Sequence, residues 1–262
     1  MGRMRADRRL VDIVISTLES LFTNLASKLD FDGDILEYMT ASVYGYNDDV
    51  VTLYKGNDAA SFVKLVYDAQ KRGFLFDTSA NGPAAPNWRT FMAAAFDKAA
   101  EDIQEWIAAQ RAAGITKIPA PLVINITDGA PFEGEGIDAM TKARQAAERL
   151  KAIQTPDGNV LVFNIHFTTD ANGARLILPS KAPIDQYLRF LYDASSVIPE
   201  KLFETAREIF QEPGITKESR AMISNENDPR TLLRFITWGT STGDVIDAGV
   251  RLAGIEPAKP RR

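Results

Sequence analysis

The stretch Pro121–Gly134, which reads PLVINITDGAPFEG, limits the possible folds more than any other part of the chain. Its first part, Leu122–Ile126, is a short apolar run rich in β-branched residues, and this run stops abruptly at Thr127. A run that is apolar on both faces suits a parallel strand with helices on both sides of it. Asp128, which comes next, is therefore expected at the carboxyl end of a buried strand, where open α/β sheets bind their ligands.

The rest of the chain alternates between helical and extended patterns. Apolar residues spaced three and four apart predict helices at Ala6–Leu29, Ala59–Gln70, Asn87–Ala112, Ile137–Ile153, Ile184–Tyr192 and Pro199–Phe210. Runs rich in β-forming residues predict a hairpin of Glu37–Tyr46 and Val50–Tyr54, a buried strand at Val160–Thr168 and a short extended piece at Arg175–Leu178. The segment Leu232–Thr237 is apolar but fits both patterns. This order of elements predicts an α/β fold with a mostly parallel sheet.

Composition excludes several classes of protein and site. The 262 residues suffice for one large domain, and 45% apolar and 25% charged residues are ordinary for a soluble globular chain. A net charge of -5 gives no general attraction to nucleic acid or to an anionic membrane. The absence of cysteine excludes disulfides, thiolate metal sites and cysteine nucleophiles. With no apolar run that approaches the roughly 18 residues of a membrane helix and no signal-peptide core, the expected location is cytoplasmic.

The residues Val123–Pro131 carry a family resemblance. An apolar-x-apolar-Thr-Asp-Gly-x-Pro strand end resembles the third motif of von Willebrand factor A (vWA) domains. In that family the aspartate helps to build a metal-ion-dependent adhesion site (MIDAS), which holds magnesium or a similar ion. The resemblance covers about Met1–Thr240 and implies a Rossmann-like vWA fold with helices on both faces of the sheet, followed by a tail at Ser241–Arg262. The alternative for Asp128 is a simple Asp-Gly turn after a strand.

A second motif of the same family is matched in part at the start of the long helix. Arg89-Thr90-Phe91-Met92 places a threonine two residues before a methionine, ahead of the helix that leads to Asp128. The resemblance implies that Thr90 is a second metal ligand, although Phe91 replaces the usual proline. The alternative is that the Thr90 hydroxyl caps its own helix.

The first motif of the family, D-x-S-x-S followed by methionine, has no match at the expected place. The chain begins Met1-Gly2-Arg3-Met4 and continues directly into the first long helix. In the simplest interpretation, Met1 corresponds to the methionine that closes the motif, and the central strand and the first ligand loop are missing. A chain of this kind is expected to bind metal poorly and to lack a middle strand in its parallel sheet.

The resemblance implies a protein-binding module and not an enzyme, similar to the stand-alone bacterial vWA proteins of tellurite-resistance and stress-response systems. Asp128 and Thr90 would hold Mg²⁺ or Mn²⁺ weakly, and an acidic residue of a protein partner would complete the shell. Two alternatives remain open. Asp128 with Glu133, Glu135 or Asp138 could form the acidic site of a metal-dependent hydrolase or phosphotransferase. Equally, the chain could be a scaffold with a vestigial metal site.

His166 is the only histidine and lies within a predicted strand. A histidine in this position is expected to be a hydrogen-bonded structural residue and not a catalytic base. The chain contains neither a Walker A sequence nor G-x-G-x-x-G, so neither route to nucleotide binding is supported.

Overall fold

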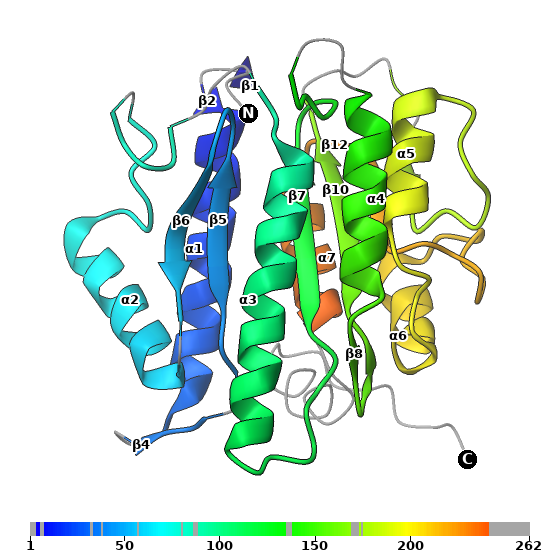
Figure 1. Ribbon diagram of the computed structural model, residues 1–262. Coiled ribbons are helices and arrows are strands. Elements are labelled where there is room, and N and C mark those ends of the chain that lie inside the picture. The colour runs from blue at the N-terminus through cyan, green and yellow to red at the C-terminus, as the bar shows by residue number, and fades with distance from the viewer. Residues whose placement is uncertain are drawn as a thin grey trace, which may run out of the picture.

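The computed structural model describes residues 4–5, 8–31, 34–37, 39–56, 58–79, 81–85, 89–134, 138–168, 173 and 175–240. Within these residues, helices cover a mostly parallel sheet, and the predicted α/β class is confirmed (Figure 1). The predicted tail Ser241–Arg262 lies outside the described residues.

The main sheet has the strand order β11 (Leu176–Ile177), β12 (Met222–Glu226), β10 (Leu161–Phe167) and β7 (Leu122–Thr127). β7 and β12 run parallel to β10, and only the short edge strand β11 is antiparallel. The pairing of β7 with β10 is regular along its whole length. Asp128 therefore follows the carboxyl end of a parallel strand, as its sequence predicts.

A second, two-stranded sheet is formed by the hairpin of β5 (Ser42–Tyr46) and β6 (Val50–Lys55). The prediction that this strand begins at Glu37 is wrong. The carboxylate of Glu37 accepts a hydrogen bond from the backbone N–H of Ala59 (2.9 Å), at the start of the next helix, so this residue serves a helix end instead of a strand. Three further pairs of two-residue strands are β1–β2 (Met4–Arg5, Arg8–Arg9), β3–β4 (Asp30–Phe31, Asp34–Ile35) and β8–β9 (Gln154–Thr155, Gly158–Asn159).

The helices lie on both faces of the sheet (Figure 1). They are α1 (Leu10–Leu29), α2 (Ala59–Arg72), α3 (Met92–Ala112), α4 (Ala139–Lys151), α5 (Gln186–Ala194), α6 (Glu200–Phe210) and α7 (Pro229–Thr240). Alternate residues of β10 enter two separate cores. Phe163 and Ile165 pack with α1, α2, α6 and α7, whereas Val162 packs with α3, α4 and α5. β10 is therefore covered on both faces, which explains its continuous apolar sequence.

Helices α4 and α5 begin later than their sequence patterns predict, because an aspartate caps each of them. Asp138 accepts a hydrogen bond from the backbone N–H of Thr141 at the start of α4, and Asp185 accepts one from that of Leu188 at the start of α5. The helix predicted from Ala6 likewise begins only at Leu10, where Arg9 is paired with Asp12 of the first turn (2.8 Å).

Helix α1 is long and apolar enough to cross a membrane by length and composition alone. The expectation that no apolar run approaches the length of a membrane helix is therefore wrong for α1, in which polar residues interrupt the apolar ones but leave the helix as a whole apolar enough. In the structure its apolar stripe packs against α2 and α7.

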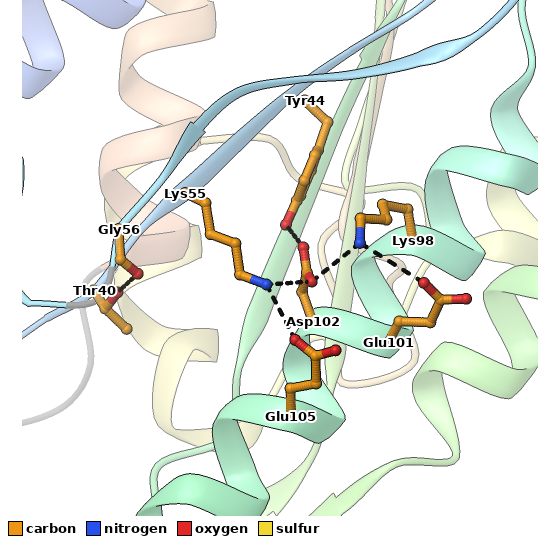
Figure 2. A network of polar contacts seen from close by, with 8 residues as sticks. All are labelled: Thr40, Tyr44, Lys55, Gly56, Lys98, Glu101, Asp102 and Glu105. Atoms are coloured by element: carbon orange, nitrogen blue, oxygen red, sulfur yellow. Dashed lines mark hydrogen bonds and ion pairs between the residues drawn. The ribbon is translucent and has the colours of Figure 1, made fainter.

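The hairpin is attached to α3 through Asp102, a buried carboxylate on the side of that helix (Figure 2). Tyr44 of β5 donates its hydroxyl to Asp102, and Lys55 of β6 donates its ammonium to the same carboxylate (2.7 Å). Lys98, one turn earlier on α3, donates a third hydrogen bond (3.3 Å). Burial and the bond to Asp102 raise the pKa of Tyr44 to about 12. This network orients the hairpin beside β7 without any strand pairing between them.

Candidate functional site

The two predicted metal ligands, Asp128 and Thr90, belong to segments that meet at the carboxyl end of β7. The backbone N–H of Phe132, four residues after Asp128, donates to the carbonyl of Thr90 (2.9 Å). Phe132 also stacks on Phe91, with ring centroids 6.3 Å apart. The loop after β7 is thus fastened to the start of α3, and both predicted residues lie at this edge of the sheet, each half-buried.

Glu133 caps the start of α3. Its carboxylate is buried and accepts a hydrogen bond from the backbone N–H of Ala93 (2.7 Å), while Lys142 of α4 lies 3.6 Å away. The capping position itself is occupied by Phe91, whose side chain cannot accept a hydrogen bond. The alternative in which the Thr90 hydroxyl caps its own helix is therefore wrong. Glu133 fills that role from the loop that bears Asp128.

Two tyrosines enclose the turn at Asp128. Tyr187 of α5 donates its hydroxyl to the carbonyl of Gly129 (2.8 Å), and Tyr46 at the end of β5 donates to the carbonyl of Ile126 (3.2 Å). Burial raises the pKa of both phenols, and the negative charge of Asp128 raises it further. Both hydroxyls therefore remain protonated donors throughout the physiological pH range.

A chain of buried hydrogen bonds runs from this edge across the sheet. The Tyr46 hydroxyl donates to Oδ1 of Asn125 on β7, and Nδ2 of Asn125 donates to Oδ1 of Asn164 on β10 (2.9 Å). Asn164 in turn donates to Oγ of Ser195, just after α5 (2.9 Å), and this hydroxyl donates to the carbonyl of Leu191 (2.7 Å). Both asparagines are nearly or fully buried, so these bonds satisfy polar groups that would otherwise be costly inside the core.

His166 occupies a structural position, as its sequence context predicts. It is buried on β10, where its ring meets Tyr187 edge to face with centroids 5.2 Å apart. The backbone N–H of Asn225 on the neighbouring strand donates to its Nδ1 (3.4 Å). The imidazole is thus part of the packing between the sheet and α5.

The acidic residues after Asp128 do not gather into a cluster in the described part of the chain. Glu133 turns to the start of α3 and Asp138 to the start of α4, and Glu135 lies outside the described residues. No group of three or more acidic, histidine or cysteine side chains suited to a metal ion occurs among the residues that the structure describes. Among the described residues, the predicted cation ligands at this edge therefore remain Asp128 and Thr90.

Sequence reasoning does not identify Tyr46, Tyr187 or the cap at Glu133. For Glu133 the sequence suggests a different role, that of an acidic residue in a hydrolase site. Tyrosine spacing along the chain carries no signal that residues 46 and 187 meet at one turn, because their proximity depends on tertiary packing.

Comparison with known proteins leaves the family open. No family model, curated protein or solved structure matches this chain. The geometry of the site is therefore the basis on which a function can be assigned.

Proposed function

We propose that this chain is a protein-binding module with a Rossmann-like vWA fold, in which Asp128 and Thr90 hold a divalent cation, Mg²⁺ or Mn²⁺. The observation that supports this proposal best is the hydrogen bond from Phe132 to the carbonyl of Thr90, because it brings the segments of the two residues to one edge of the sheet. The edge is the carboxyl end of a parallel strand, where open α/β sheets bind ligands.

The chemistry of the two side chains fits a weak, exchangeable site. Mg²⁺ prefers oxygen ligands, keeps several waters and is often bound by only one or two carboxylates. One carboxylate and one hydroxyl leave most of the cation's charge uncompensated, so a carboxylate from a partner can replace a bound water. Because Glu133 is buried and engaged with α3, it does not compete for that position. With so few charged ligands, a dissociation constant on the order of millimolar is expected.

The proposal predicts that Asp128→Ala weakens binding of Mn²⁺ at least about tenfold, because it removes the single charged ligand. Electron paramagnetic resonance of free Mn²⁺ during titration of the protein measures this directly. Thr90→Val, which removes a neutral ligand of similar shape, is expected to weaken binding less. Mg²⁺ should compete for the same site.

Asp138→Asn is the matched control, since it removes a nearby carboxylate that caps α4 and is not a proposed ligand. Its Mn²⁺ affinity should equal that of the unmodified chain. Equal affinities for the unmodified chain and Asp128→Ala would refute the proposal. A loss of binding in Asp138→Asn, together with Mn²⁺-dependent phosphoester cleavage that Asp128→Ala abolishes, would instead favour the hydrolase alternative.

A further inference from the structure

Arg89 lies beside the proposed cation site and is exposed to solvent. It directly precedes Thr90 in the segment that leads into α3. Its Cζ atom lies over the ring of Phe132, 5.6 Å from the ring centroid, which is within the range of a cation–π contact. Phe132 belongs to the loop that bears Asp128, so the side chain of Arg89 joins the two segments that carry the proposed ligands.

The ring of Phe132 is a fixed support for this guanidinium. It stacks on Phe91 with an interplanar angle of 20°, and both rings are half-buried. The backbone N–H of Phe132 is also bonded to the carbonyl of Thr90 (2.9 Å). An arginine that rests on a fixed ring samples fewer positions than one that extends freely into solvent, and it therefore loses less conformational entropy when it binds a partner.

The N–H donors of Arg89 have no acceptor in the described part of the chain. The contact with Phe132 involves the aromatic ring and uses no hydrogen bond, and no ion pair is formed there. Lys142, a basic residue of the same edge, is in contrast paired with Glu133 (3.6 Å). A guanidinium carries five N–H donors in a planar fork that matches the two oxygens of a carboxylate. Arg89 therefore keeps its donors available for an acid from outside the chain.

Two acidic residues of the adjoining segments already have other partners. Glu133 is buried and accepts the backbone N–H of Ala93 (2.7 Å). Asp49 lies in the hairpin turn and accepts the backbone N–H of Val50 (2.7 Å). Neither of them neutralises Arg89.

The charges at this edge indicate how many acidic groups a partner should supply. A divalent cation held by the carboxylate of Asp128 and the neutral hydroxyl of Thr90 keeps one positive charge. Arg89 adds a second positive charge next to it. A single carboxylate from the partner would neutralise only one of the two.

We propose that Arg89 is a second docking point for the partner, which presents two neighbouring acidic residues. One carboxylate completes the shell of the cation, and the other forms a bidentate ion pair with Arg89. This inference rests on the proposed function, because the cation positions the first carboxylate. It specifies the partner as a segment with a pair of acidic side chains.

The test compares labelled synthetic peptides that are titrated into the full chain in Mg²⁺ and followed by fluorescence anisotropy. One set carries two glutamates in a glycine-serine sequence, with no, one or two glycines between them. In the matched set the second glutamate is replaced by glutamine. At the best spacing, the two-glutamate peptide should bind about fivefold more tightly than its matched peptide, as expected for a well-oriented exposed ion pair.

Arg89→Gln is the decisive variant, because it removes the charge and the fork of donors. Its preference for the two-glutamate peptide should disappear, whereas Arg89→Lys, which keeps the charge alone, should retain part of it. Arg144→Gln is the matched control, since it removes an exposed arginine of α4 and should leave the preference unchanged. Mn²⁺ should bind to Arg89→Gln at least as tightly as to the unmodified chain, because a nearby positive charge has been removed.

Two results would overturn this inference and leave the proposed function intact. In both, the one-glutamate peptide binds in Mg²⁺ and not in EDTA, so the cation site works. The first is equal affinity of the unmodified chain for the matched peptides at every spacing. The second is a preference that persists in Arg89→Gln, since another group would then hold the second carboxylate. If Mn²⁺ binds to Asp128→Ala as tightly as to the unmodified chain, the proposed function itself fails and the inference fails with it.

Discussion

Replacing Trp238 by alanine is expected to lower the free energy of unfolding by about 4 kcal/mol. Trp238 lies on α7 and is 1% exposed. Its ring stacks on Phe163 of β10 (5.3 Å between centroids) and meets Phe210 edge to face (5.6 Å). Its indole N–H donates to the carbonyl of Leu202 (3.1 Å). Alanine leaves a cavity between α6, α7 and the sheet and removes the indole hydrogen bond, although Thr205 still donates to the carbonyl of Leu202.

Urea unfolding followed by far-ultraviolet circular dichroism measures this change without relying on tryptophan fluorescence. Trp106→Ala is the matched control, because Trp106 on α3 is only half-buried and should cost far less. If Trp238→Ala unfolded at nearly the same urea concentration as Trp106→Ala, the aromatic cluster would not be the centre of this core.

The second large effect is expected at Asp102, which joins the hairpin to α3. Asp102→Ala should cost about 2 kcal/mol, because it removes the acceptor of Tyr44, Lys55 and Lys98 together. The cost stays below that of breaking a fully buried ion pair, since the two lysines are partly exposed and can be hydrated. Hydrogen exchange should show the loss mainly in β5 and β6, which α3 no longer holds.

Glu101→Ala is the control for Asp102. Glu101 is the preceding residue of α3, its side chain is 68% exposed, and its contact with Lys98 is a surface ion pair of 3.7 Å. Such pairs contribute little to stability. Equal exchange rates in the hairpin of both variants would show that the hairpin is held by something other than Asp102.

The same carboxylate predicts a response to acid. Burial alone would raise the pKa of Asp102, but the hydrogen bonds from Lys55, Tyr44 and Lys98 outweigh it and hold this pKa below its ordinary value. An aspartate with a lowered pKa in the folded state stabilises that state above its unfolded pKa of about 3.9, and this contribution is lost as pH falls through the folded pKa. The difference in melting temperature between the unmodified chain and Asp102→Ala should therefore be constant near neutral pH and shrink below about pH 4. A difference that persists unchanged in acid would contradict this account.

The elements predicted correctly from the sequence are those whose apolar pattern matches the burial that they have in the fold. The strands at Leu122 and Leu161, which lie in the sheet beneath helices, are apolar on both faces, and α1 and α3 carry long apolar stripes. In contrast, strand β12 is not predicted. Its sequence MISNE contains Ser224 and Glu226, which are polar yet buried, and Arg175 neutralises Glu226 from outside the strand (2.8 Å). A local pattern cannot anticipate a partner 51 residues away.

In the candidate site, too, the sequence predicts some features, and others depend on partners that are distant along the chain. The family resemblance implies that Asp128 and Thr90 lie at one edge of the sheet, and their segments do meet there. The cap supplied by Glu133 and the two tyrosines depend on how α3, α5 and the hairpin pack, which no spacing along the chain encodes. The metal-binding role of Asp128 and Thr90 stays a prediction.

The buried row from Tyr46 to Ser195 has one fixed polarity. Each amide nitrogen points away from β5 and each amide oxygen toward it, and this orientation is set at one end by the phenol that donates to Asn125. Without that phenol, the oxygen of the first amide would lose its donor inside the core, where an unsatisfied polar group is costly.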